Sequence, residues 1–533
     1  MQKIETQQIK TRLVRKKVPE RLRFLWALGV TGGALFILAL SQASAESVRI
    51  RVFNPAQKNQ HSVIQQVFSK AGQTYSMSGY DVSLMGSLNS VSAGEQKSVE
   101  LKKASQFQVQ CLASTKNRPA KVVVKLTNPK NQSAGSDGHQ VVGSDVYEFE
   151  EGVWIASPAG FLRVQDLPFR EELGFFVPKR ARYPDLKNAG TGKDSIELGC
   201  EVINRISLER YVEGILNAEI STKWHPEAVK AQIIAARTYT YYQIQENRKS
   251  GLRAGIEANR PAGAGRTSSL ADAKSLVKTF DLEAGVKDQV YAGVSKEDWK
   301  GSELVRETEG MILSLKPSSH KGQDGGKNDV KNGRKKGGQS QENQPLPIKA
   351  FYHSTCGGET ELPENVWGAK QLGVGKKAVC TYCLRSPAYR WKIEISKTEI
   401  EKLLASEFGI DLHQFTLLNV GLVKSSVSGS VRPRNASVEI EWKPMGGASL
   451  AAGVIKRKLS AVKFRDLMGT TVIKSTRFEV VKKEKGFEFE GNGYGHGVGL
   501  CQWGAKALAE QGKKAAEILE FYYPETQVVR LAK

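Results

Sequence analysis

The stretch GNGYGHGVGLCQWGAKALAEQGKKAAEILEFYY, residues 491–523, decides how the C-terminal part of the chain is interpreted. Glycine occupies every second position from 491 to 499. Residues two apart share one face of a strand, so this pattern predicts a strand with a continuous strip of bare backbone. Such a strip costs ordering entropy and suits a place where another segment must approach closely. Tyr494 and His496 would lie on the opposite face, and a helical period broken at Gly512 follows.

Size and composition indicate a globular protein with more than one domain. The 533 residues are 40% hydrophobic and 25% charged, which is enough for two or more cores and unlike a disordered chain. The 78 Lys and Arg residues against 55 Asp and Glu give a net charge of +23. Such a charge favours encounters with nucleic acid, anionic lipid or an anionic cell-wall polymer. The compartment of the protein decides among these partners.

The N-terminal segment bears on the compartment. Six basic residues between positions 12 and 23 precede an apolar run at 24–40, and Ala43-Ser44-Ala45 then fits the small-x-small rule for signal cleavage. The apolar run is also just long enough to span a membrane. Residues 1–45 are therefore predicted to be a signal peptide or an inner-membrane anchor, and membrane contact is expected only there. We expect the remainder to be exported to the periplasm or cell envelope, which argues against nucleic acid as a partner.

Composition also divides the exported part. Residues 47–180 contain β-branched and alternating segments separated by Gly, Asn and Pro, and they predict a β-rich accessory domain at 46–190 without catalytic residues. Residues 316–346 have no aromatic side chain and many Lys and Gly residues, which predicts a flexible basic insertion. The rest of 191–533 is predicted to be a mixed α/β catalytic domain. The expected fold class is α+β.

A carboxylate continues an apolar helical face in SLERYVEGILNAEIS, residues 207–221. Ser207 suits the N-cap position, and Val212 and Ile215 follow the spacing of a buried face that next reaches Glu219. Burial would raise the pKa of the Glu219 carboxyl and keep it protonated near neutral pH, as a general acid requires. If the helix end turns to water instead, Glu219 is an ordinary surface residue. Periodicity alone does not decide between these two interpretations.

The next segment, WHPEAVKAQIIAARTYTYYQIQ at 224–245, predicts a long helix that begins at Pro226. Lys230 and Arg237 are seven positions apart and therefore share one face. A solvated charged face is the ordinary interpretation of such a pair. Small residues beside Arg237 would let another molecule approach, so the two cations are also candidates for binding hydroxyls or an anionic group of a substrate.

A metal site is predicted between residues 353 and 383. His353 and Cys356 form an HxxC pair, and Cys380 and Cys383 form a CxxC pair. Four N and S ligands complete a closed tetrahedral zinc site, which is typical of structural zinc. In an oxidising compartment, a disulfide between two of these cysteines is the alternative. The remaining cysteines, at positions 111, 200 and 501, allow one disulfide, and the sequence does not define which two are paired.

Three segments resemble the stage II sporulation protein D family (SpoIID/LytB): YVEGILNAEISTKWHPEAVKAQIIAARTY at 211–239, FYHSTCGGETELPENVW at 351–367 and GNGYGHGVGLCQWGAKALAEQG at 491–512. DQVYAG at 288–293 and ILEFYYP at 518–524 are shorter similarities. The resemblance runs from about residue 203 to 526, interrupted by the basic insertion. The order and length of the segments make it specific, and the β-rich region lies outside it.

This resemblance implies a peptidoglycan lytic transglycosylase. Such an enzyme cleaves the bond between N-acetylmuramic acid and N-acetylglucosamine without water and leaves a 1,6-anhydro end, with several relatives preferring glycan strands that lack stem peptides. It implies Glu219 as the catalytic acid, in NAEIS where relatives usually have AEMP. It also implies basic substrate-binding residues at Lys230 and Arg237, and Tyr494, His496 and Gln502 are expected to line the cleft opposite Glu219. Relatives differ in whether they bind zinc, and no organic cofactor is expected.

Two other functions compete with this one. The first is a non-catalytic glycan-binding protein that enhances a cell-wall amidase. The second is a zinc hydrolase, which would need an open metal position and a metal-activated water. The four-ligand count at His353, Cys356, Cys380 and Cys383 argues against the hydrolase. A single credible carboxylate suits the transglycosylase, because the C6 hydroxyl of the sugar serves as nucleophile, whereas hydrolytic glycosidases typically need two.

Overall fold

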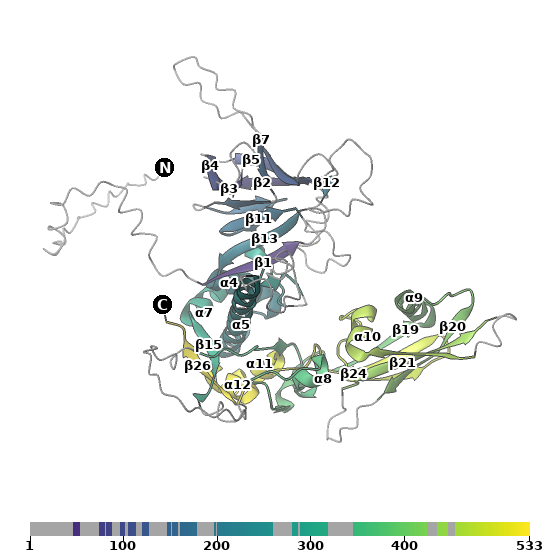
Figure 1. Cartoon of the computed structure of the whole chain (residues 1–533). Helices are drawn as coiled ribbons and strands as arrows, with labels where there is room; N and C mark the ends of the chain where they lie inside the picture. The colour runs from purple at the N-terminus through teal and green to yellow at the C-terminus, as the bar shows by residue number, and fades with distance from the viewer. Residues whose placement is uncertain are drawn as a thin grey trace, which may run out of the picture. The chain divides into compact units, whose positions relative to one another are not determined.

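A computed structural model gives the conformation of most of the chain after residue 45 (Figure 1). The structure describes residues 46–53, 74–79, 82–87, 96–101, 105–112, 120–126, 146–150, 152–157, 160–177, 197–198, 200–258, 280–285, 288–317, 345–423, 434–445 and 453–532. The predicted signal or anchor segment at 1–45 and positions 318–344 of the predicted insertion lie outside these residues. Within the described ranges, no helix combines the length and the apolar character needed to cross a bilayer.

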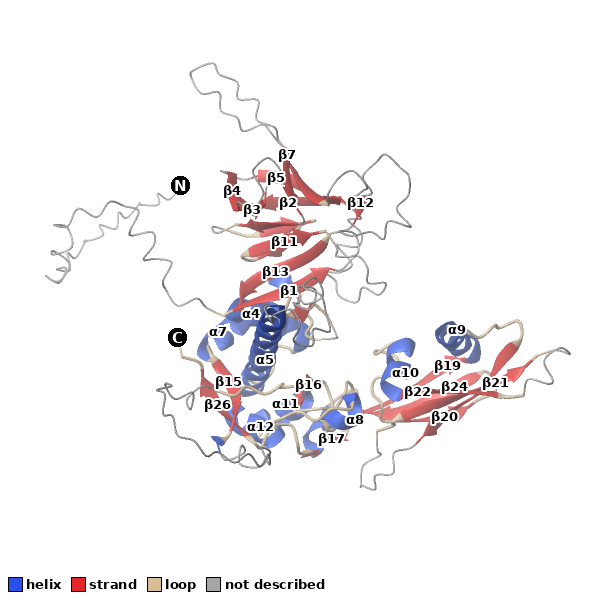
Figure 2. Ribbon diagram, in the orientation of Figure 1, coloured by secondary structure: helices blue, strands red, loops and turns tan. Residues whose placement is uncertain are grey.

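The N-terminal half is built from two β-sheets, as Figure 2 shows. Their strands are β1 (Ser47–Phe53), β2 (Thr74–Gly79), β3 (Val82–Ser87), β4 (Gln96–Leu101), β5 (Ser105–Leu112), β6 (Lys121–Leu126), β7 (Val146–Glu150), β8 (Gly152–Ala156), β9 (Leu162–Val164), β10 (Leu167–Phe169), β11 (Glu172–Phe176), β12 (Glu197–Leu198), β13 (Glu201–Ser207) and β14 (Leu282–Glu283). The first sheet has the order β14-β1-β13-β11-β8-β3-β4, and the second β10-β9-β2-β5-β6-β7 with β12 paired to β5. Alternating residues of both sheets fill one core, in which Ile50 of β1 and Val122 of β6 are fully buried.

A disulfide joins Cys111 of β5 to Cys200, the residue immediately before β13. The bond connects the two sheets across 89 residues of sequence. The Cys200 N–H also donates a hydrogen bond of 3.0 Å to the buried hydroxyl of Tyr75 on β2. The pairing that the sequence left undefined is therefore Cys111 with Cys200, and Cys501 is a free thiol.

The predicted domain boundary at residue 190 does not coincide with a division of the structure. β13 lies beyond that boundary, yet it pairs with β1 on one side and β11 on the other in the first sheet. β14, from still further along the chain, pairs with β1 in parallel. Tyr211 and Tyr239, which lie on the helices after β13, are buried in the core of the sheets. The β-rich region and the helices therefore share packing, which composition does not reveal.

Among the described residues between β13 and residue 311 lie the helices α4 (Leu208–Glu219), α5 (Pro226–Ala258) and α7 (Trp299–Glu307). Ser207 stands at the N-cap of α4, and Pro226 is the first residue of α5, as the sequence predicts. Val212 and Ile233 pack in a separate small core with Leu304 of α7. The amphipathic face of α4 is thus covered along its length, and Glu219 is its last residue.

The chain returns to these helices at its C-terminus. β15 (Met311–Leu315) pairs antiparallel with β26 (Thr526–Arg530), and α11 (Gln502–Glu510) and α12 (Ala515–Tyr522) contact α5. The helical period after residue 500 and its interruption at Gly512 are confirmed, since Gly512 has a φ of 87° between the two helices. Buried residues of α5, α11 and α12 form one core with three cysteines from 356 to 383.

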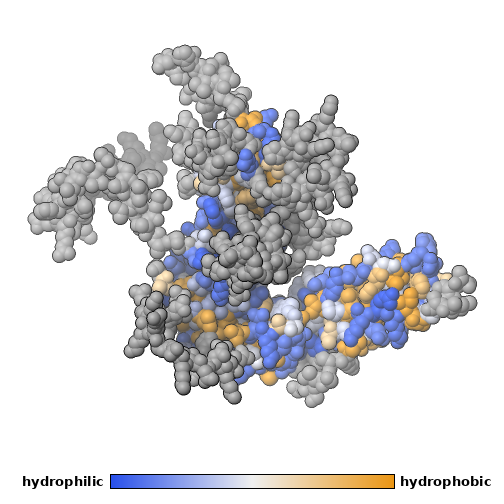
Figure 3. Space-filling view, in the orientation of Figure 1, coloured by the Kyte–Doolittle hydropathy of each residue, from blue (hydrophilic) through white to orange (hydrophobic). Residues whose placement is uncertain are grey.

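A module inserted before the C-terminal helices has its own core. It contains β19 (Arg390–Ser396), α9 (Lys397–Phe408), β20 (Phe415–Val423), β21 (Ser437–Pro444), β22 (Ile455–Ser460), α10 (Ala461–Met468), β23 (Phe478–Lys482) and β24 (Gly486–Asn492). Two three-stranded sheets, β19-β24-β23 and β20-β21-β22, bury Trp442 and Phe464 in a core made only of residues from this module. On its visible face, hydrophilic and hydrophobic residues are intermixed (Figure 3). The sequence analysis placed this module within the catalytic domain without separating it.

The glycine-rich segment is not the strand that its alternation predicts. β24 ends at Asn492, and Gly493, Gly495, Gly497 and Gly499 all have positive φ values, between 69° and 102°. A Cβ atom at Gly493 would lie 2.7 Å from the carbonyl oxygen of Thr355. Left-handed backbone and close approach to the segment after residue 351 therefore explain the glycines. The expected close packing is confirmed, and the extended face with aligned side chains is wrong.

Candidate functional site

Glu219 occupies the C-terminal end of α4 with its carboxyl half-buried. Its Oε1 accepts a hydrogen bond of 2.6 Å from the backbone N–H of Val290. Burial raises the pKa of Glu219 from 4.5 to about 7, although the Val290 hydrogen bond works in the opposite direction. The structure therefore favours the buried-face interpretation of Glu219 over the solvated one. Its catalytic role stays a prediction.

Polar side chains that the sequence analysis did not single out lie next to Val290, the hydrogen-bond partner of Glu219, or interact electrostatically with Glu219. Gln289, next to Val290, accepts hydrogen bonds from the Tyr211 hydroxyl at 3.0 Å and from the Thr240 hydroxyl at 2.8 Å. Burial and, next, the charge of Glu219 raise the pKa of Tyr352 well above its ordinary value. The buried Tyr352 hydroxyl makes no hydrogen bond of normal geometry with the described residues. An unsatisfied buried hydroxyl beside a protonatable carboxyl is a feature of a binding or catalytic site.

A second carboxylate close by is fully engaged. Asp288 Oδ1 accepts a hydrogen bond of 2.8 Å from the Tyr239 hydroxyl, and Oδ2 accepts one of 2.9 Å from the backbone N–H of Glu283. The charges of both Asp288 and Glu219 act on the buried Tyr211 hydroxyl and help to raise its pKa. Asp288 therefore fixes the loop that carries Gln289 and Val290. The only sequence signal for this loop was the short family similarity at 288–293.

His496 belongs to an aromatic cluster with three other rings. The centroid of its imidazole lies 5.0 Å from that of Trp367, 5.6 Å from that of His353 and 6.0 Å from that of Phe351. Burial, followed by the charges of His353 and two arginines, lowers the pKa of His496 well below 6.5, so its imidazole is neutral. Its Nδ1 accepts a hydrogen bond from the Val498 N–H.

Tyr494 does not join this cluster. Its backbone pairs with Thr355, and its hydroxyl acts electrostatically on Arg465 of the inserted module. Gln502, which was expected to face the same cleft, is buried, and its Nε2 lies 3.4 Å from Oε1 of Gln232 on α5. The structure therefore does not align Tyr494, His496 and Gln502 along one face, because the segment between them is not a strand.

The assignment of Arg237 to substrate binding is wrong. Its side chain is 0% exposed, and its Nε and Nη2 donate to the two carboxylate oxygens of Glu209 at 2.9 and 2.7 Å. Nη1 donates to the carbonyl of Met311 at 3.1 Å. Burial lowers the pKa of Arg237, and the Glu209 charge opposes that effect. This bidentate pair joins α4 and α5 and leaves no surface for a ligand.

Lys230 is also committed to ion pairs. Its Nζ lies 2.7 Å from a carboxylate oxygen of Glu307 and 3.3 Å from one of Glu227. The hydrogen bond to Glu307 raises the pKa of Lys230. Lys230 therefore connects α5 to the end of α7, and its predicted contact with substrate has no support in this geometry.

The predicted metal site contains a different fourth ligand. The sulfur atoms of Cys356, Cys380, Cys383 and Cys501 all lie within 4.8 Å of one another, and all four residues are buried. His353 is not in the group, and its Nδ1 lies 3.0 Å from the carbonyl oxygen of Val498. The ligand set is corrected by replacing His353 with Cys501. β16 (Tyr352–His353) and β25 (Leu500–Cys501) pair in parallel, and this contact places Cys501 against the loop of Cys356.

These four cysteines fit a zinc ion. Tetrahedral coordination with Zn–S bonds of about 2.3 Å needs sulfur atoms about 3.8 Å apart, comparable to the compact group observed. Gly504 on α11 allows the close passage, since a Cβ there would lie 2.7 Å from the Cys380 sulfur. The buried guanidinium of Arg477 donates to the carbonyls of Gly357 and Glu359 and so holds the loop after Cys356. A closed set of four thiolates is typical of structural zinc.

Comparisons with known proteins find similarity in the part of the chain that carries Glu219. A family model described as stage II sporulation protein (SpoIID) matches residues 197–315, which include α4, α5 and the Val290 loop. Stage II sporulation protein D of Bacillus amyloliquefaciens is 25% identical over 67% of the chain and 88% of its own length. The chain therefore carries a match to the SpoIID family at residues 197–315 and is similar over most of its length to proteins named stage II sporulation protein D.

Other relatives extend the comparison. An uncharacterised protein of Brachyspira hyodysenteriae is 28% identical over 62% of this chain and 68% of its own length. A Bacillus subtilis protein named amidase enhancer is 26% identical over 59% of the chain, but only 40% of its own length is covered. A second family model, for a domain of unknown function, matches residues 383–499. That match coincides with the inserted module and the glycine-rich segment.

Proposed function

We propose that this protein is a peptidoglycan lytic transglycosylase with Glu219 as its acid and base. The coarser conclusion, a function related to the cell wall, is supported by the family and by the relative named amidase enhancer. The observation that supports the finer proposal is the half-buried Glu219 carboxyl, with a pKa of about 7 and with the unsatisfied Tyr352 hydroxyl beside it. A carboxyl with such a pKa is populated in both protonation states at neutral pH.

The reaction requires one proton donor and no water. Glu219 donates its proton to the glycosidic oxygen as the bond from that oxygen to C1 of N-acetylmuramic acid breaks. The resulting carboxylate then accepts the proton of the C6 hydroxyl of the same sugar, whose oxygen bonds to C1 and forms the 1,6-anhydro ring. Asp288 is not needed for this route, because both of its oxygens already accept hydrogen bonds.

The proposed substrate is a glycan strand, with strands that lack stem peptides preferred. Such a substrate places the protein in the periplasm or cell envelope, where the basic N-terminal segment and its apolar run would deliver or anchor it. The charge of +23 would hold the protein near anionic envelope polymers. A cell-wall amidase that removes stem peptides is the proposed protein partner.

We also propose that Cys356, Cys380, Cys383 and Cys501 bind a structural zinc ion. The full-length protein should contain one zinc per chain, measured by elemental analysis, and Cys501→Ser should abolish it. His353→Asn should retain zinc, since His353 is outside the ligand set. Zinc loss in His353→Asn but not in Cys501→Ser would reject this assignment. Disulfides within the cluster, detected by thiol titration of the metal-free protein as purified, would also reject it.

The test of the proposed reaction is mass spectrometry of peptide-free glycan strands after incubation with the full-length protein. Wild type should release 1,6-anhydro ends, whereas Glu219→Gln should release none above background and should still bind the strands. Glu213→Gln is the matched control, because Glu213 is a buried carboxylate of the same helix that pairs with Arg210. Anhydro products from Glu219→Gln would overturn the proposal.

The same experiment distinguishes the other candidate functions. Strand binding by wild type without any cleavage, together with faster hydrolysis by an added amidase, would identify an enhancer. Products with reducing ends, or removed acetyl groups, would identify a hydrolase. Immediate loss of turnover on chelation, before any loss of helical structure, would require a metal at the reacting centre rather than in the four-cysteine cluster.

A further inference from the structure

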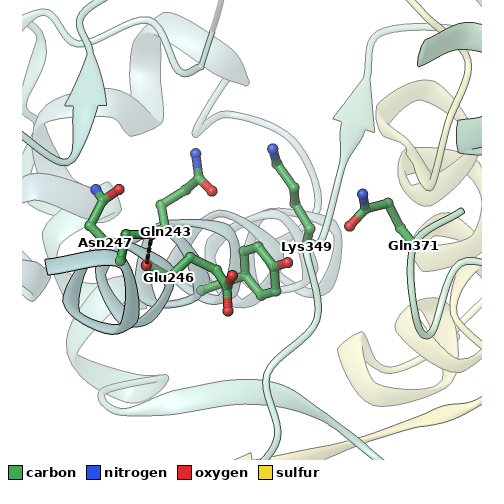
Figure 4. Close-up of a pocket in the computed structure, with 7 residues that line it drawn as sticks. Gln243, Glu246, Asn247, Lys349 and Gln371 are labelled. Atoms are coloured by element: carbon green, nitrogen blue, oxygen red, sulfur yellow. Dashed lines mark hydrogen bonds between the residues drawn. The ribbon is translucent and has the colours of Figure 1, made fainter. Parts of the chain in front are cut away.

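A polar pocket lies beside the second half of α5 (Figure 4). Its volume is about 360 Å³, within the range of roughly 300–1,000 Å³ for sites that bind small ligands. Gln243 and Asn247, which are one helical turn apart on α5, line one side of it, and Gln371 lines it from a loop. Figure 4 shows Gln243 and Gln371 on either side of Lys349. Three carboxamides therefore line one cavity.

The groups that line this pocket are held in place by the fold. Gly373 has a φ of 74°, and a Cβ atom there would lie 2.5 Å from Cγ2 of Ile348. The glycine thus lets the loop of Gln371 lie against the segment that carries Lys349. Asn247 is fixed from the other side, because its Nδ2 donates a hydrogen bond of 3.1 Å to Asp281. A site that is ordered before the ligand arrives loses less entropy on binding.

The carboxamides retain hydrogen-bonding capacity toward a ligand. In the part of the chain that the structure describes, the side chains of Gln243 and Gln371 make no hydrogen bond. Each of these side chains offers two N–H donors and a carbonyl acceptor. A ligand that is rich in hydroxyl and acetamido groups can use both kinds of partner.

The two charged side chains of the lining already have partners in the protein. The Glu246 carboxylate lies 2.8 Å from the Lys249 Nζ. The Lys349 Nζ lies 5.6 Å from the ring centroid of Tyr239 and 5.3 Å from that of Phe351, and both distances suit a cation–π contact. Recognition of a phosphate group would require several cations or a bidentate arginine. The lining therefore fits a neutral polar ligand better than an anion.

An exposed aromatic ring adjoins the pocket. Trp367 is the last residue of the short helix α8 (Pro363–Trp367) and lies four positions before Gln371. Phe351 stacks on its ring, with 4.5 Å between the centroids and 25° between the planes. Trp367 is nevertheless 45% exposed, so its ring is supported by Phe351 and still accessible to a ligand. The apolar face of a sugar ring can pack against such a surface.

Tyr239 connects this surface with the Glu219 site. Its ring centroid lies 5.9 Å from that of Phe351, and its hydroxyl donates a hydrogen bond of 2.8 Å to Asp288, two residues before Val290. Gln243 follows Tyr239 by one turn of α5, which is about 6 Å along the helix axis. A glycan strand that extends from Glu219 along α5 would therefore reach the pocket.

We propose that the pocket and the Trp367 ring form a distal subsite for a neutral N-acetylated sugar, the N-acetylglucosamine unit of the glycan strand. The inference rests on the proposed function and adds to it a position that holds the strand away from the reacting bond. Trp367 packs against the apolar face of the sugar, and the carboxamides of Gln243 and Gln371 bind its hydroxyl and acetamido groups. The subsite does not detect stem peptides, because these are attached to the other sugar of the strand.

Calorimetric binding to the full-length Glu219→Gln protein tests the subsite without turnover. The probes are chitin oligosaccharides, which consist of N-acetylglucosamine, and cellulose oligosaccharides of the same length, which lack the acetamido group and should bind more weakly. Gln243→Ala combined with Gln371→Ala should weaken binding of chitin oligosaccharides by roughly ten- to hundredfold, as expected for two lost neutral hydrogen bonds. Gln245→Ala removes the same type of side chain two positions along α5, outside the lining. This matched control should have no effect.

The aromatic part of the subsite is tested with the same probes. Trp367→Ala should weaken binding of both oligosaccharides by about tenfold, since packing against the ring does not need the acetamido group, and Trp367→Phe should retain most of the affinity. Trp299→Ala, which removes a tryptophan that is 78% exposed at the start of α7, should leave both affinities unchanged. Because the ligand is neutral, raising the salt concentration should not weaken binding. Equal affinities of the double glutamine variant and its parent would overturn the subsite.

Two results separate the subsite from the proposed reaction. If wild type releases anhydro ends, but Gln243→Ala combined with Gln371→Ala leaves KM for long strands unchanged, the subsite fails and the transglycosylase stands. If wild type releases no anhydro ends, but the same two substitutions weaken binding of chitin oligosaccharides and Gln245→Ala does not, the subsite stands and the proposed reaction fails.

Discussion

Glu209 and Glu219 lie on the same helix, α4, in opposite situations. Glu209 accepts two hydrogen bonds from Arg237 and one of 3.1 Å from the backbone N–H of Gly310, so its charge is fully compensated. Glu219 accepts only the Val290 N–H among the hydrogen bonds that the structure shows for its carboxyl. A satisfied carboxylate stabilises the fold, whereas an incompletely satisfied one has a shifted pKa and can exchange a proton. The partners of each residue, rather than its position on the helix, distinguish the paired carboxylate of Glu209 from the carboxyl of Glu219 that we propose as the acid and base.

Removal of the Glu219 carboxyl should give the largest effect in this comparison. Glu219→Gln should lower kcat for release of anhydro ends by about 10²- to 10⁴-fold, the range for loss of a general acid and base. The side chain keeps its size, so strand affinity should stay within about twofold. Initial rates on peptide-free strands measure this effect. If Glu209→Gln remained fully folded and lost as much activity as Glu219→Gln, the two carboxylates would not differ in role.

Removal of the Glu209 carboxylate should act on stability. Glu209→Gln leaves the Arg237 guanidinium, which is 0% exposed, without its counter-charge. Breaking a buried pair in this way costs about 3 kcal/mol, at the low end of the usual range because Glu209 itself is partly exposed. Urea unfolding at neutral pH measures the change. Glu303→Gln, at an exposed position of α7, should change the free energy of unfolding by less than about 0.5 kcal/mol.

The shifted pKa of Glu219 should make stability depend on pH. The folded-state pKa of about 7 exceeds the ordinary value of 4.5, so the folded state binds this proton more tightly than the unfolded state. The contribution of Glu219 to stability is therefore greatest below pH 4.5 and falls as pH rises toward and through 7. Glu219→Gln cannot ionise and should be more stable than wild type at pH 8, by up to about 3 kcal/mol, but not at pH 4.

Urea unfolding of wild type and of Glu219→Gln at several pH values between 4 and 8 measures this difference in the free energy of unfolding. Glu213→Gln is the control for a buried carboxylate of the same helix. Because the proposed reaction requires Glu219 to donate a proton, kcat should also fall as pH rises through the same interval. A constant difference in stability between Glu219→Gln and wild type at every pH would show that the carboxyl is not desolvated.

Substitution of Lys230 should have the smallest effect. Its ion pairs with Glu227 and Glu307 are partly exposed, and exposed pairs contribute less than about 1 kcal/mol. Lys230→Met should therefore lower the free energy of unfolding by at most this amount and leave KM unchanged. A tenfold rise in KM at constant stability would restore Lys230 as a substrate-binding residue.

The helices around Glu219 could be predicted because their signals are local. The N-cap at Ser207, the proline at the start of α5 and the apolar spacing that ends at Glu219 all depend on residues within a few turns of one another. Gln289, Val290 and Tyr352 could not be predicted as neighbours of Glu219. They approach it from a loop and a short strand far along the chain, with Val290 already 71 residues away, and no local period marks such contacts.

The glycine-rich segment shows why a local pattern can mislead. Alternation is the signature of a strand, but the same spacing serves a loop whose alternate residues adopt positive φ. The two are distinguished by what lies against the backbone, here the segment from residue 351 to 357. A contact of the same long range determines the fourth cysteine of the cluster. Parallel pairing of β16 with β25 joins Tyr352 to Leu500, which are 148 positions apart, and so brings Cys501 to the position where the sequence predicted His353.

By itself, the sequence determined the β-rich and helical character of each region, the family segments and the carboxyl on an apolar face. The tertiary structure alone decided which charges are satisfied. It placed Arg237 in a closed ion pair, fixed the disulfide as Cys111–Cys200 and created the pocket beside α5. Secondary structure follows from interactions within a few residues, whereas desolvation and hydrogen-bond satisfaction depend on groups that are brought together only when the chain folds.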